Sequence, residues 1–294
     1  MASGTIQVDV VVKGTDVLGE CPLWCEREQA LWWVDSRGPS LKRWDPANDQ
    51  VRVIPLPGPV GSVAFREKGG MLAALQAGIY FLDTQSGALE RAAQPEARLP
   101  ENRFNDGRCD RAGRFWAGTM CDVKREPTGA LYRLSPDRGC KRMFGEVIVP
   151  NSIAWSPDNG TMYFADTYRQ VIRAFDFDLV AGEIANERVF CDTSGHPGRP
   201  DGSCIDADGC LWNAEYGGWR LVRYTPAGKI DRVIAMPVAN PTCCCFGGPD
   251  FETLYVTSAT QRLSPEELAL QPLAGSIFAV RPGVRGLPES RFVG

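Results

Sequence analysis

The stretch Leu31-Trp32-Trp33-Val34-Asp35 is a short apolar run of the kind that forms a buried β-strand. Similar aromatic or aliphatic runs recur along the chain at a spacing of roughly 40 to 50 residues, which is the range of β-propeller blades. The further runs span residues 71–75, 114–119, 162–166, 210–214 and 253–257. The sequence therefore indicates six copies of one supersecondary unit.

A second strand signal follows each of these runs and ends in turn residues. The second signals span 41–46, 79–83, 130–136, 171–176, 221–226 and 276–280. Apolar and polar residues alternate within them, which is the pattern of half-buried strands. We therefore predict an all-β protein in which residues 1–294 form a single six-bladed β-propeller domain. Its blades are expected to be mostly four-stranded and antiparallel, around a central channel.

Two segments fall outside this repeat. The apolar stretch 6–12 precedes the first repeat, and we expect it to pair with the last blade and to close the ring. The stretch 264–270 starts with Ser at a position suited to an N-cap, followed by Pro, and it predicts a single short helical turn in a loop.

The composition excludes several classes of protein. A net charge of −4, with scattered Lys and Arg, argues against a nucleic-acid-binding face. No run approaches the ~20 apolar residues of a membrane span, and the first ten residues lack the pattern of a secretory signal. The eleven cysteines include no CxxC pair, which indicates reduced and mostly buried thiols. We expect a cytoplasmic protein that binds neither nucleic acid nor membranes.

Polar residues recur at the position where each innermost strand is expected to start. A propeller gathers these positions around its channel, because each blade presents the same end there. Four of the six positions have a carboxylate or carboxamide, namely Glu20, Asn105, Asn151 and Asp201, and the other two are Gly61 and Thr242. Two carboxylates brought together repel each other, and a divalent cation removes that penalty. Glu20, Asn151 and Asp201 thus predict an oxygen-only site suited to Ca, Mg or Mn.

The same residue types also have a purely structural interpretation. Asn and Asp beside Gly or Pro commonly form turns, so the shared phase, and not any single residue, supports the metal site. Arg103 and Asn105 are two residues apart, which in an extended segment places both side chains on one face and Phe104 on the other. Arg103 then offers donors to hydroxyl or carboxylate oxygens, unless it pairs with an acidic surface residue. Asp106 is expected to cap the following turn.

Other catalytic signatures are missing from the sequence. The chain has one histidine, so a histidine-rich zinc site is excluded. It contains no GxSxG elbow, P-loop or GxGxxG fingerprint. Ser-His-Asp hydrolysis and nucleotide chemistry are therefore not favoured.

Several blocks of the sequence resemble the regucalcin (senescence marker protein)/gluconolactonase/luciferin-regenerating family. The blocks span residues 19–24, 102–107, 150–155, 200–206, 244–248 and 273–278, and they follow one another in order at blade spacing. The resemblance implies a six-bladed propeller that hydrolyses sugar lactones with the help of one divalent metal ion.

The resemblance also implies roles for individual residues. Glu20, Asn151 and Asp201 match the metal ligands of the family, and Asp201 also matches its proposed general base. The metal would be Ca, Zn, Mn, Mg or Fe(II). Arg103 and Asn105 match the substrate-binding pair.

One block departs from the pattern of animal relatives. Regucalcin-like members from animals have adjacent acidic residues after the Gly-Thr-Met block, whereas Cys121-Asp122-Val123 follows that block here. Asp122 is the candidate for the second acidic substrate contact. The departure favours a bacterial-type sugar lactonase.

We therefore expect a metal-dependent hydrolase that opens aldonolactones, such as gluconolactone or a pentonolactone, to aldonic acids. It would act on a small molecule as a monomer or weak homo-oligomer. Two alternatives remain open at this point. One is a phosphotriesterase on the same scaffold, acting on organophosphorus esters as diisopropyl-fluorophosphatase does. The other is a calcium-binding or regulatory propeller without catalysis.

Overall fold

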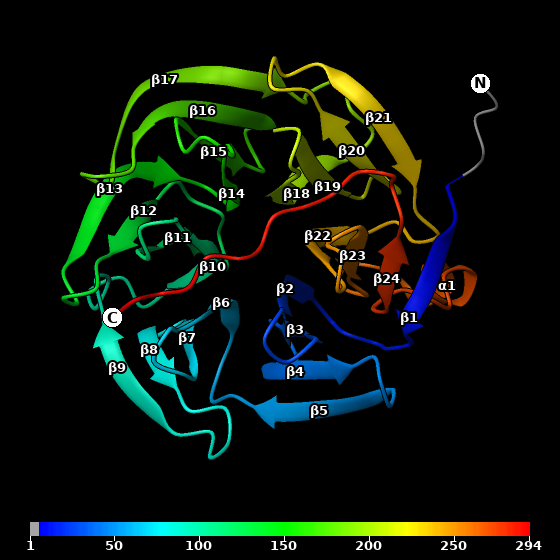
Figure 1. The fold of residues 1–294 in the computed structure, drawn as a ribbon, viewed down its shortest axis with the longest axis horizontal. Coiled ribbons are helices and arrows are strands. Elements are labelled where there is room, and N and C mark those ends of the chain that lie inside the picture. Colours follow the sequence, from blue (N-terminus) through cyan, green and yellow to red (C-terminus); the bar gives the residue numbers. More distant parts are fainter. Residues whose placement is uncertain (1–5) are drawn as a thin grey trace.

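The computed structural model describes residues 6–294 as six four-stranded antiparallel sheets arranged in a ring around a channel (Figure 1). Residues 1–5 lie outside the described residues. They belong to the predicted domain and to the N-terminal segment that lacks the pattern of a secretory signal. The ring confirms the predicted six-bladed propeller. In each blade, one strand lies next to the channel and three follow outward.

Each of the first five blades uses four consecutive strands. Blade 1 consists of β2 (Gly19–Cys25), β3 (Ala30–Asp35), β4 (Ser40–Asp45) and β5 (Gln50–Pro55). Blade 2 consists of β6 (Val60–Phe65), β7 (Met71–Leu75), β8 (Gly78–Leu82) and β9 (Leu89–Ala93). Blade 3 consists of β10 (Asn102–Cys109), β11 (Phe115–Cys121), β12 (Gly129–Leu134) and β13 (Cys140–Val147).

The next two blades repeat this arrangement. Blade 4 consists of β14 (Pro150–Trp155), β15 (Thr161–Asp166), β16 (Val171–Asp178) and β17 (Glu183–Asp192). Blade 5 consists of β18 (Arg199–Ile205), β19 (Leu211–Tyr216), β20 (Arg220–Tyr224) and β21 (Ile230–Ala235). The aromatic runs of the sequence therefore form the second strand of each blade, and the alternating runs form the third.

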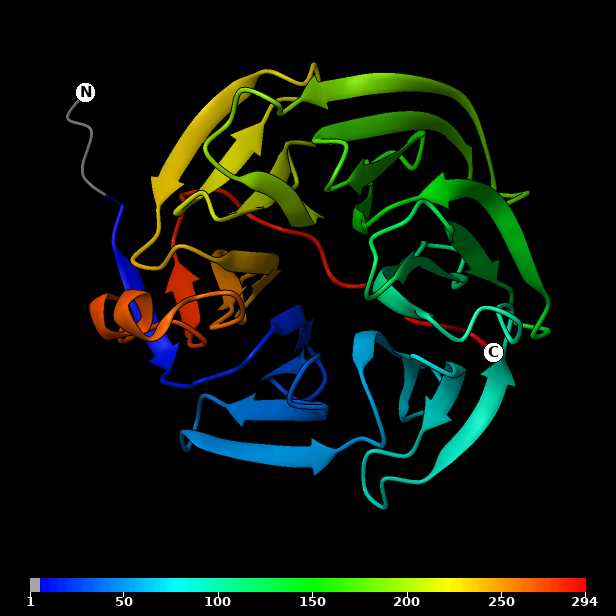
Figure 2. The same cartoon turned by 180° about the vertical axis from the view of Figure 1, so that it is seen from behind.

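The sixth blade joins the two ends of the chain. It contains β22 (Pro241–Gly247), β23 (Thr253–Ser258), β24 (Ile277–Val280) and the N-terminal strand β1 (Val8–Val12). β1 pairs antiparallel with β24, as predicted for the apolar segment 6–12, and so closes the ring. The short helix α1 (Pro265–Leu270) lies at the outer side of this blade, orange in Figure 2, and begins at the N-cap Ser264.

The hydrophobic core lies between neighbouring blades. Trp33, Trp116 and Trp212, all on second strands, are among the largest fully buried side chains. Between blades 3 and 4, for example, Trp116 packs in one cluster with Ile153 and Phe164. Each blade is therefore covered on both faces, which explains why the second strands are apolar throughout.

Every innermost strand carries a register irregularity near its start. The shifts lie between Glu20 and Leu23, Val60 and Ser62, Phe104 and Gly107, Asn151 and Ala154, Pro200 and Ser203, and Pro241 and Cys244. A bulge interrupts the ladder and turns side chains out of the regular alternation. The polar residues in phase with the repeat lie at or beside these bulges, which directs them toward the channel.

The C-terminal segment, residues 281–294, crosses the central opening and is the red chain in Figures 1 and 2. It joins distant blades through backbone hydrogen bonds. Phe292 N–H donates to Phe65 O at 2.8 Å, Gly286 N–H to Phe251 O at 2.8 Å, and Ala207 N–H to Arg285 O at 2.8 Å. Phe65 ends β6 and Ala207 follows β18, so the segment covers the end of the channel where the innermost strands finish.

The cysteines are free, and nine of the eleven are buried. This agrees with the expectation of reduced, mostly buried thiols. Over residues 6–294, no helix combines the length and the apolar character that crossing a membrane requires.

Candidate functional site

The other end of the channel holds a cavity lined by five of the six residues predicted for the site. They are Glu20 on β2, Arg103 and Asn105 on β10, Asn151 on β14 and Asp201 on β18. All five lie in the first half of an innermost strand, so they face the end at which these strands begin. The expected convergence is confirmed, and the chemical roles of these residues stay predictions.

Glu20 and Asp201 are neighbouring carboxylates in this cavity. Among residues 6–294, neither forms an ion pair with Lys, Arg or His. Burial, followed by the charges of Asp201 and Asp106, raises the pKa of Glu20 well above its ordinary value. Burial and the charge of Asp106 likewise raise the pKa of Asp201, a residue that is 5% exposed. A cation bound between them would remove this repulsion and keep both acids ionised.

Asn151 is held in one orientation by its neighbours. Its Nδ2 donates to Thr167 Oγ1 at 2.7 Å, and its Oδ1 accepts from Asn105 Nδ2 at 3.1 Å. Thr167 donates in turn to the carbonyl of Pro200, the residue before Asp201, at 2.7 Å. Because an amide oxygen has two lone pairs, Asn151 Oδ1 retains capacity for one further partner in the cavity.

Arg103 and Asn105 form the pair that their spacing predicts. Arg103 Nη1 donates to Asn105 Oδ1 at 2.8 Å, which confirms that the two side chains share a face. Phe104 is buried in the core between blades 2 and 3 on the other side. Arg103 Nε donates to Asp122 Oδ1 at 2.7 Å, so the pairing with an acid considered from the sequence also occurs. Within the described chain, Nη2 forms no hydrogen bond with protein, which leaves it for a ligand.

Asp122 lies behind Arg103 and does not line the cavity. Arg37 of blade 1 donates to both of its oxygens, at 2.5 and 2.8 Å. Burial raises the pKa of Asp122, but the guanidiniums of Arg103 and Arg37 outweigh this effect and lower it to about 2. Substrate contact by Asp122 stays a prediction, and these contacts favour a positioning role toward Arg103.

Asp106 caps the following turn, as expected, and also makes a contact with the next blade. One oxygen accepts from Gly107 N–H at 2.8 Å, as a turn cap would. The other accepts from Ile153 N–H on blade 4 at 3.0 Å. Its charge also contributes to the raised pKa values of Glu20 and Asp201, although its side chain does not line the cavity.

Further cavity residues escaped the sequence analysis because they lie on loops or at strand ends. The polar ones are Arg125, Thr167, Tyr168, Arg199, Tyr216, Gln261 and Arg262. Only Arg199 had a signal in the sequence, since it precedes Asp201 by two residues on one strand. Loop residues that meet through tertiary structure have no fixed spacing that a repeat could reveal.

The donor set fits a hard divalent cation. Among residues 6–294, no three His, Cys, Asp or Glu side chains are arranged to hold a metal, so Glu20 and Asp201 need an oxygen from another residue type. Asn151 Oδ1 supplies one in the same cavity. Two carboxylates and an amide oxygen suit Ca²⁺, Mg²⁺ or Mn²⁺, with the remaining positions left for water or substrate.

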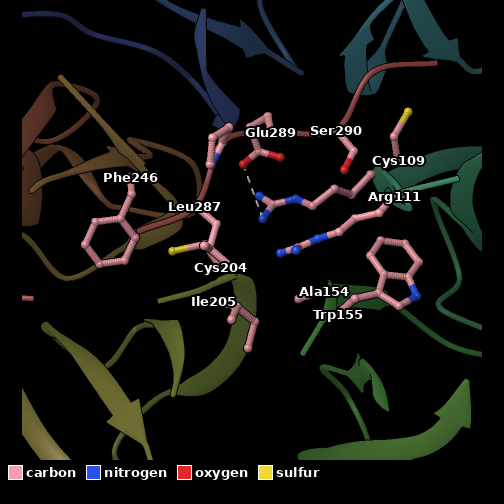
Figure 3. A pocket seen from close by; sticks show the side chains of 12 residues that line it. Cys109, Arg111, Ala154, Trp155, Cys204, Ile205, Phe246, Leu287, Glu289 and Ser290 are labelled. Carbon is pink, nitrogen blue, oxygen red and sulfur yellow. Dashed lines mark ion pairs between the residues drawn. The ribbon is translucent and has the colours of Figure 1, made fainter. Parts of the chain in front are cut away.

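The opposite end of the channel has a different character. Its pocket is bounded by the C-terminal segment, from which Leu287, Glu289 and Ser290 point inward in Figure 3. Glu289 forms an ion pair with Arg108 at 3.5 Å, drawn dashed in Figure 3. Apolar side chains such as Phe246 complete the lining. The acid of this pocket, Glu289, has a basic partner, whereas Glu20 and Asp201 at the other end have none among residues 6–294.

Comparison with known proteins agrees with this geometry. Residues 18–260 match the family described as SMP-30/Gluconolactonase/LRE-like region. The chain belongs to this family. The match includes all six predicted site residues, and it confirms the resemblance seen in the sequence blocks.

Relatives within the SMP-30/gluconolactonase family carry different names. The chain is 41% identical to a 6-deoxy-6-sulfogluconolactonase from Pseudomonas putida, over 97% of this chain and 98% of that protein. It is 36% identical to regucalcin from Xenopus laevis over 99% of both chains. Its structure resembles that of a calcium-binding protein, regucalcin, from Agrobacterium tumefaciens, with a TM-score of 0.94, 31% identity and 98% coverage of both chains.

Proposed function

We propose that this protein is a divalent-metal-dependent hydrolase that opens sugar lactones to aldonic acids. The observation that supports this most is the cavity in which Glu20 and Asp201, two carboxylates with no basic partner in residues 6–294, meet Asn151. The relative named as a sulfogluconolactonase supports a lactone as the substrate.

The chain's own residues suggest how the reaction proceeds. A divalent ion at Glu20, Asn151 and Asp201 would supply Lewis-acid polarisation of the substrate carbonyl. Asp201 takes a proton from the attacking water as the water oxygen bonds to the carbonyl carbon. The ring C–O bond then breaks, and the departing ring oxygen takes up this proton to become a hydroxyl group.

Arg103 and Asn105 hold the substrate in this scheme. Arg103 Nη2 donates to an oxygen of the sugar, while Asp122 and Asn105 fix the plane of the guanidinium. A donor that meets developing negative charge in such a site contributes about 2.7–4 kcal/mol to transition-state stabilisation. Asn105 Nδ2 donates to the carbonyl of Pro150 at 2.9 Å, which fixes the orientation of the Asn105 side chain.

A second function is favoured by one comparison. The Agrobacterium relative of known structure is described as a calcium-binding protein, and it covers the same six blades. A calcium-binding propeller without catalysis would use the same three oxygens. It would bind calcium tightly and leave lactones intact.

The decisive experiment combines chelation with a metal titration. Protein treated with EDTA and dialysed should not hydrolyse gluconolactone, and Ca²⁺, Mn²⁺, Mg²⁺ or Zn²⁺ should restore turnover, followed by acid release at constant pH. Metal should also raise the melting temperature, because an ion that binds only the folded state stabilises it by mass action.

The outcomes separate the two functions. Full lactone hydrolysis by the chelated protein would contradict a metal-dependent reaction. A rise in melting temperature with calcium, without hydrolysis of any aldonolactone under any metal, would favour the calcium-binding function. If no metal changes the melting temperature, the result would contradict the proposed metal site itself.

A further inference from the structure

The outer part of the cavity is lined by three arginines that surround one tyrosine. Arg199 Cζ lies 4.7 Å and Arg125 Cζ 5.9 Å from the ring centre of Tyr168. Arg262 Nη2 donates to Tyr168 Oη at 3.2 Å. The arginines come from blades 5, 3 and 6, and all four residues line the cavity that also holds Glu20 and Asp201. We call Arg125, Arg199 and Arg262 the arginine rim.

The arginine rim carries more positive charge than its surroundings neutralise. Over residues 6–294, Arg199 and Arg262 form no ion pair with a carboxylate. Arg125 reaches only Asp122, at 3.9 Å, and that acid already binds Arg37 and Arg103 more closely. Because the rim outweighs the effect of burial, the pKa of Tyr168 lies below its ordinary value. Arginines gathered without counter-charges form a binding site for an anion.

The rim and the acidic floor of the cavity lie at different depths. Arg199 precedes Asp201 by two residues on β18, so the two positions are separated by about 6.6 Å along the strand. This span is comparable with the length of a hexose. A sugar lactone with an anion at one end would therefore have one orientation, because the rim attracts the anion, whereas a divalent ion and the two carboxylates that hold it carry no net charge together.

We propose that the arginine rim binds an anionic group at the end of the substrate remote from the lactone carbonyl. The preferred substrates would then be aldonolactones that carry a tetrahedral oxyanion, a phosphate or a sulfonate, on their terminal carbon. This inference rests on the proposed lactonase function. The relative named 6-deoxy-6-sulfogluconolactonase already suggests an anionic lactone, and what the structure adds is the assignment of that anion to three arginines. Arg125, Arg199 and Arg262 become the residues that determine specificity.

The main test is substrate selectivity in the metal-loaded protein. We expect kcat/KM for gluconolactone 6-phosphate or 6-sulfonate to exceed that for gluconolactone about tenfold or more. The double variant Arg199→Gln/Arg262→Gln should bring this ratio close to one. Comparison of the phosphate with the sulfonate identifies which oxyanion the rim prefers. The arginines are exposed, and an unchanged melting temperature would show that the variant folds.

A matched control removes the same charge elsewhere. Arg188 is an exposed arginine on β17 that pairs with Asp176 at 2.7 Å, far from the cavity lining. Arg188→Gln should leave the selectivity ratio as in the wild type. The wild-type preference should also shrink between about 0.01 M and 1 M salt, where the Debye length falls from about 30 Å to 3 Å.

Binding of the unreactive products supplies a readout without catalysis. Calorimetry should show 6-phosphogluconate binding about tenfold or more tightly than gluconate, and the double variant should lose this difference. Equal kcat/KM for charged and uncharged lactones in the wild type would overturn the inference and leave the lactonase standing. If no lactone is hydrolysed, the proposed function fails. In that case, the difference in affinity between 6-phosphogluconate and gluconate tests the anion site alone. Equal affinities would overturn the anion site as well.

Discussion

At the scale of single residues, the site depends on acids that the protein itself does not neutralise. Asp201 is buried beside Asp106 and close to Glu20, without a basic partner in the described chain. Natural proteins rarely bury carboxylates in this way unless a cation or a reaction requires it. The predictions at this scale therefore concern charge.

Asp201→Asn removes the proposed base and nearly preserves the shape of the side chain. We expect kcat for gluconolactone to fall about 10²–10⁴-fold, the range for loss of a general base, with a smaller change in KM. Steady-state kinetics at saturating metal would measure both values. Asp158→Asn, at an exposed turn of blade 4, is the matched control and should behave as the wild type. A wild-type kcat in Asp201→Asn would rule out Asp201 as the base.

The metal-free protein should lose stability as the pH rises. Because the folded state raises the pKa values of Glu20 and Asp201, it holds protons that the unfolded state releases above about pH 4. The free energy of unfolding therefore decreases from this pH until the pH passes the raised pKa values. Urea denaturation in chelator at about pH 5 and about pH 7.5 would measure this decrease. Glu20→Gln/Asp201→Asn should flatten it, and an equally steep loss in that variant would assign it to other groups.

Asp122→Asn tests whether this acid positions Arg103 or contacts the substrate. Loss of its charge weakens the bonds from Arg103 Nε and Arg37, so we expect kcat/KM to fall about tenfold. Asp122→Glu should recover part of the loss if the carboxylate acts through Arg103. If Asp122 instead contacts the sugar, the ranking of lactones by kcat/KM would change in Asp122→Asn, and a positioning role predicts the same ranking.

At the scale of the element, the close approach of innermost strands holds the site together. Gly61 on β6 lies against β10 at the backbone of Asn105. A Cβ on Gly61 would lie 2.5 Å from Phe104 O, and closer still to Asn105 O. Only glycine allows the two strands to approach this far, which explains why this phase position carries no polar side chain.

Gly61→Ala should therefore disturb both stability and activity. We expect a loss of about 1–3 kcal/mol in the free energy of unfolding, as for overpacking, together with a lower kcat because β10 carries Arg103 and Asn105. Urea denaturation and lactone kinetics would measure the two effects. Gly58→Ala is the control, since nothing lies within 4 Å of the added Cβ. Equal behaviour of the two variants would contradict the close approach of β6 and β10.

At the scale of the whole molecule, the ring is secured at both ends of the chain. β1 completes the sixth blade, and the C-terminal segment crosses the channel end remote from the site. Phe292 anchors that segment in the core between blades 2 and 3 and is completely buried.

Phe292→Ala should open a cavity and loosen the segment. The expected loss is about 3–5 kcal/mol in the free energy of unfolding, measured by urea denaturation. Val293, which is 43% exposed, is the neighbouring control, and Val293→Ala should change stability by less than about 0.5 kcal/mol. A loss of that small size in Phe292→Ala would mean that the segment does not secure the ring.

The amino-acid pattern was sufficient to predict the architecture and part of the site. The aromatic runs recur with the blade period because each second strand is covered on both faces, and burial leaves a regular apolar signal. The sequence also predicted four residues of the site, namely Glu20, Asn105, Asn151 and Asp201. This was possible because residues at equivalent positions of successive blades lie close together around the channel. Ring closure by the segment 6–12 followed from the need to pair the last open edge.

Contacts between residues of different blades could not be predicted from this pattern. Asp122 and Arg37 meet across blades 3 and 1, and Arg125, Arg199 and Arg262 meet around Tyr168 from three blades, although no periodic spacing connects them. The C-terminal segment likewise crosses the channel without a strand pattern. Such contacts depend on where loops and chain ends lie once the ring has closed. Local propensity and periodicity report backbone form and burial, and they contain no information about those distances.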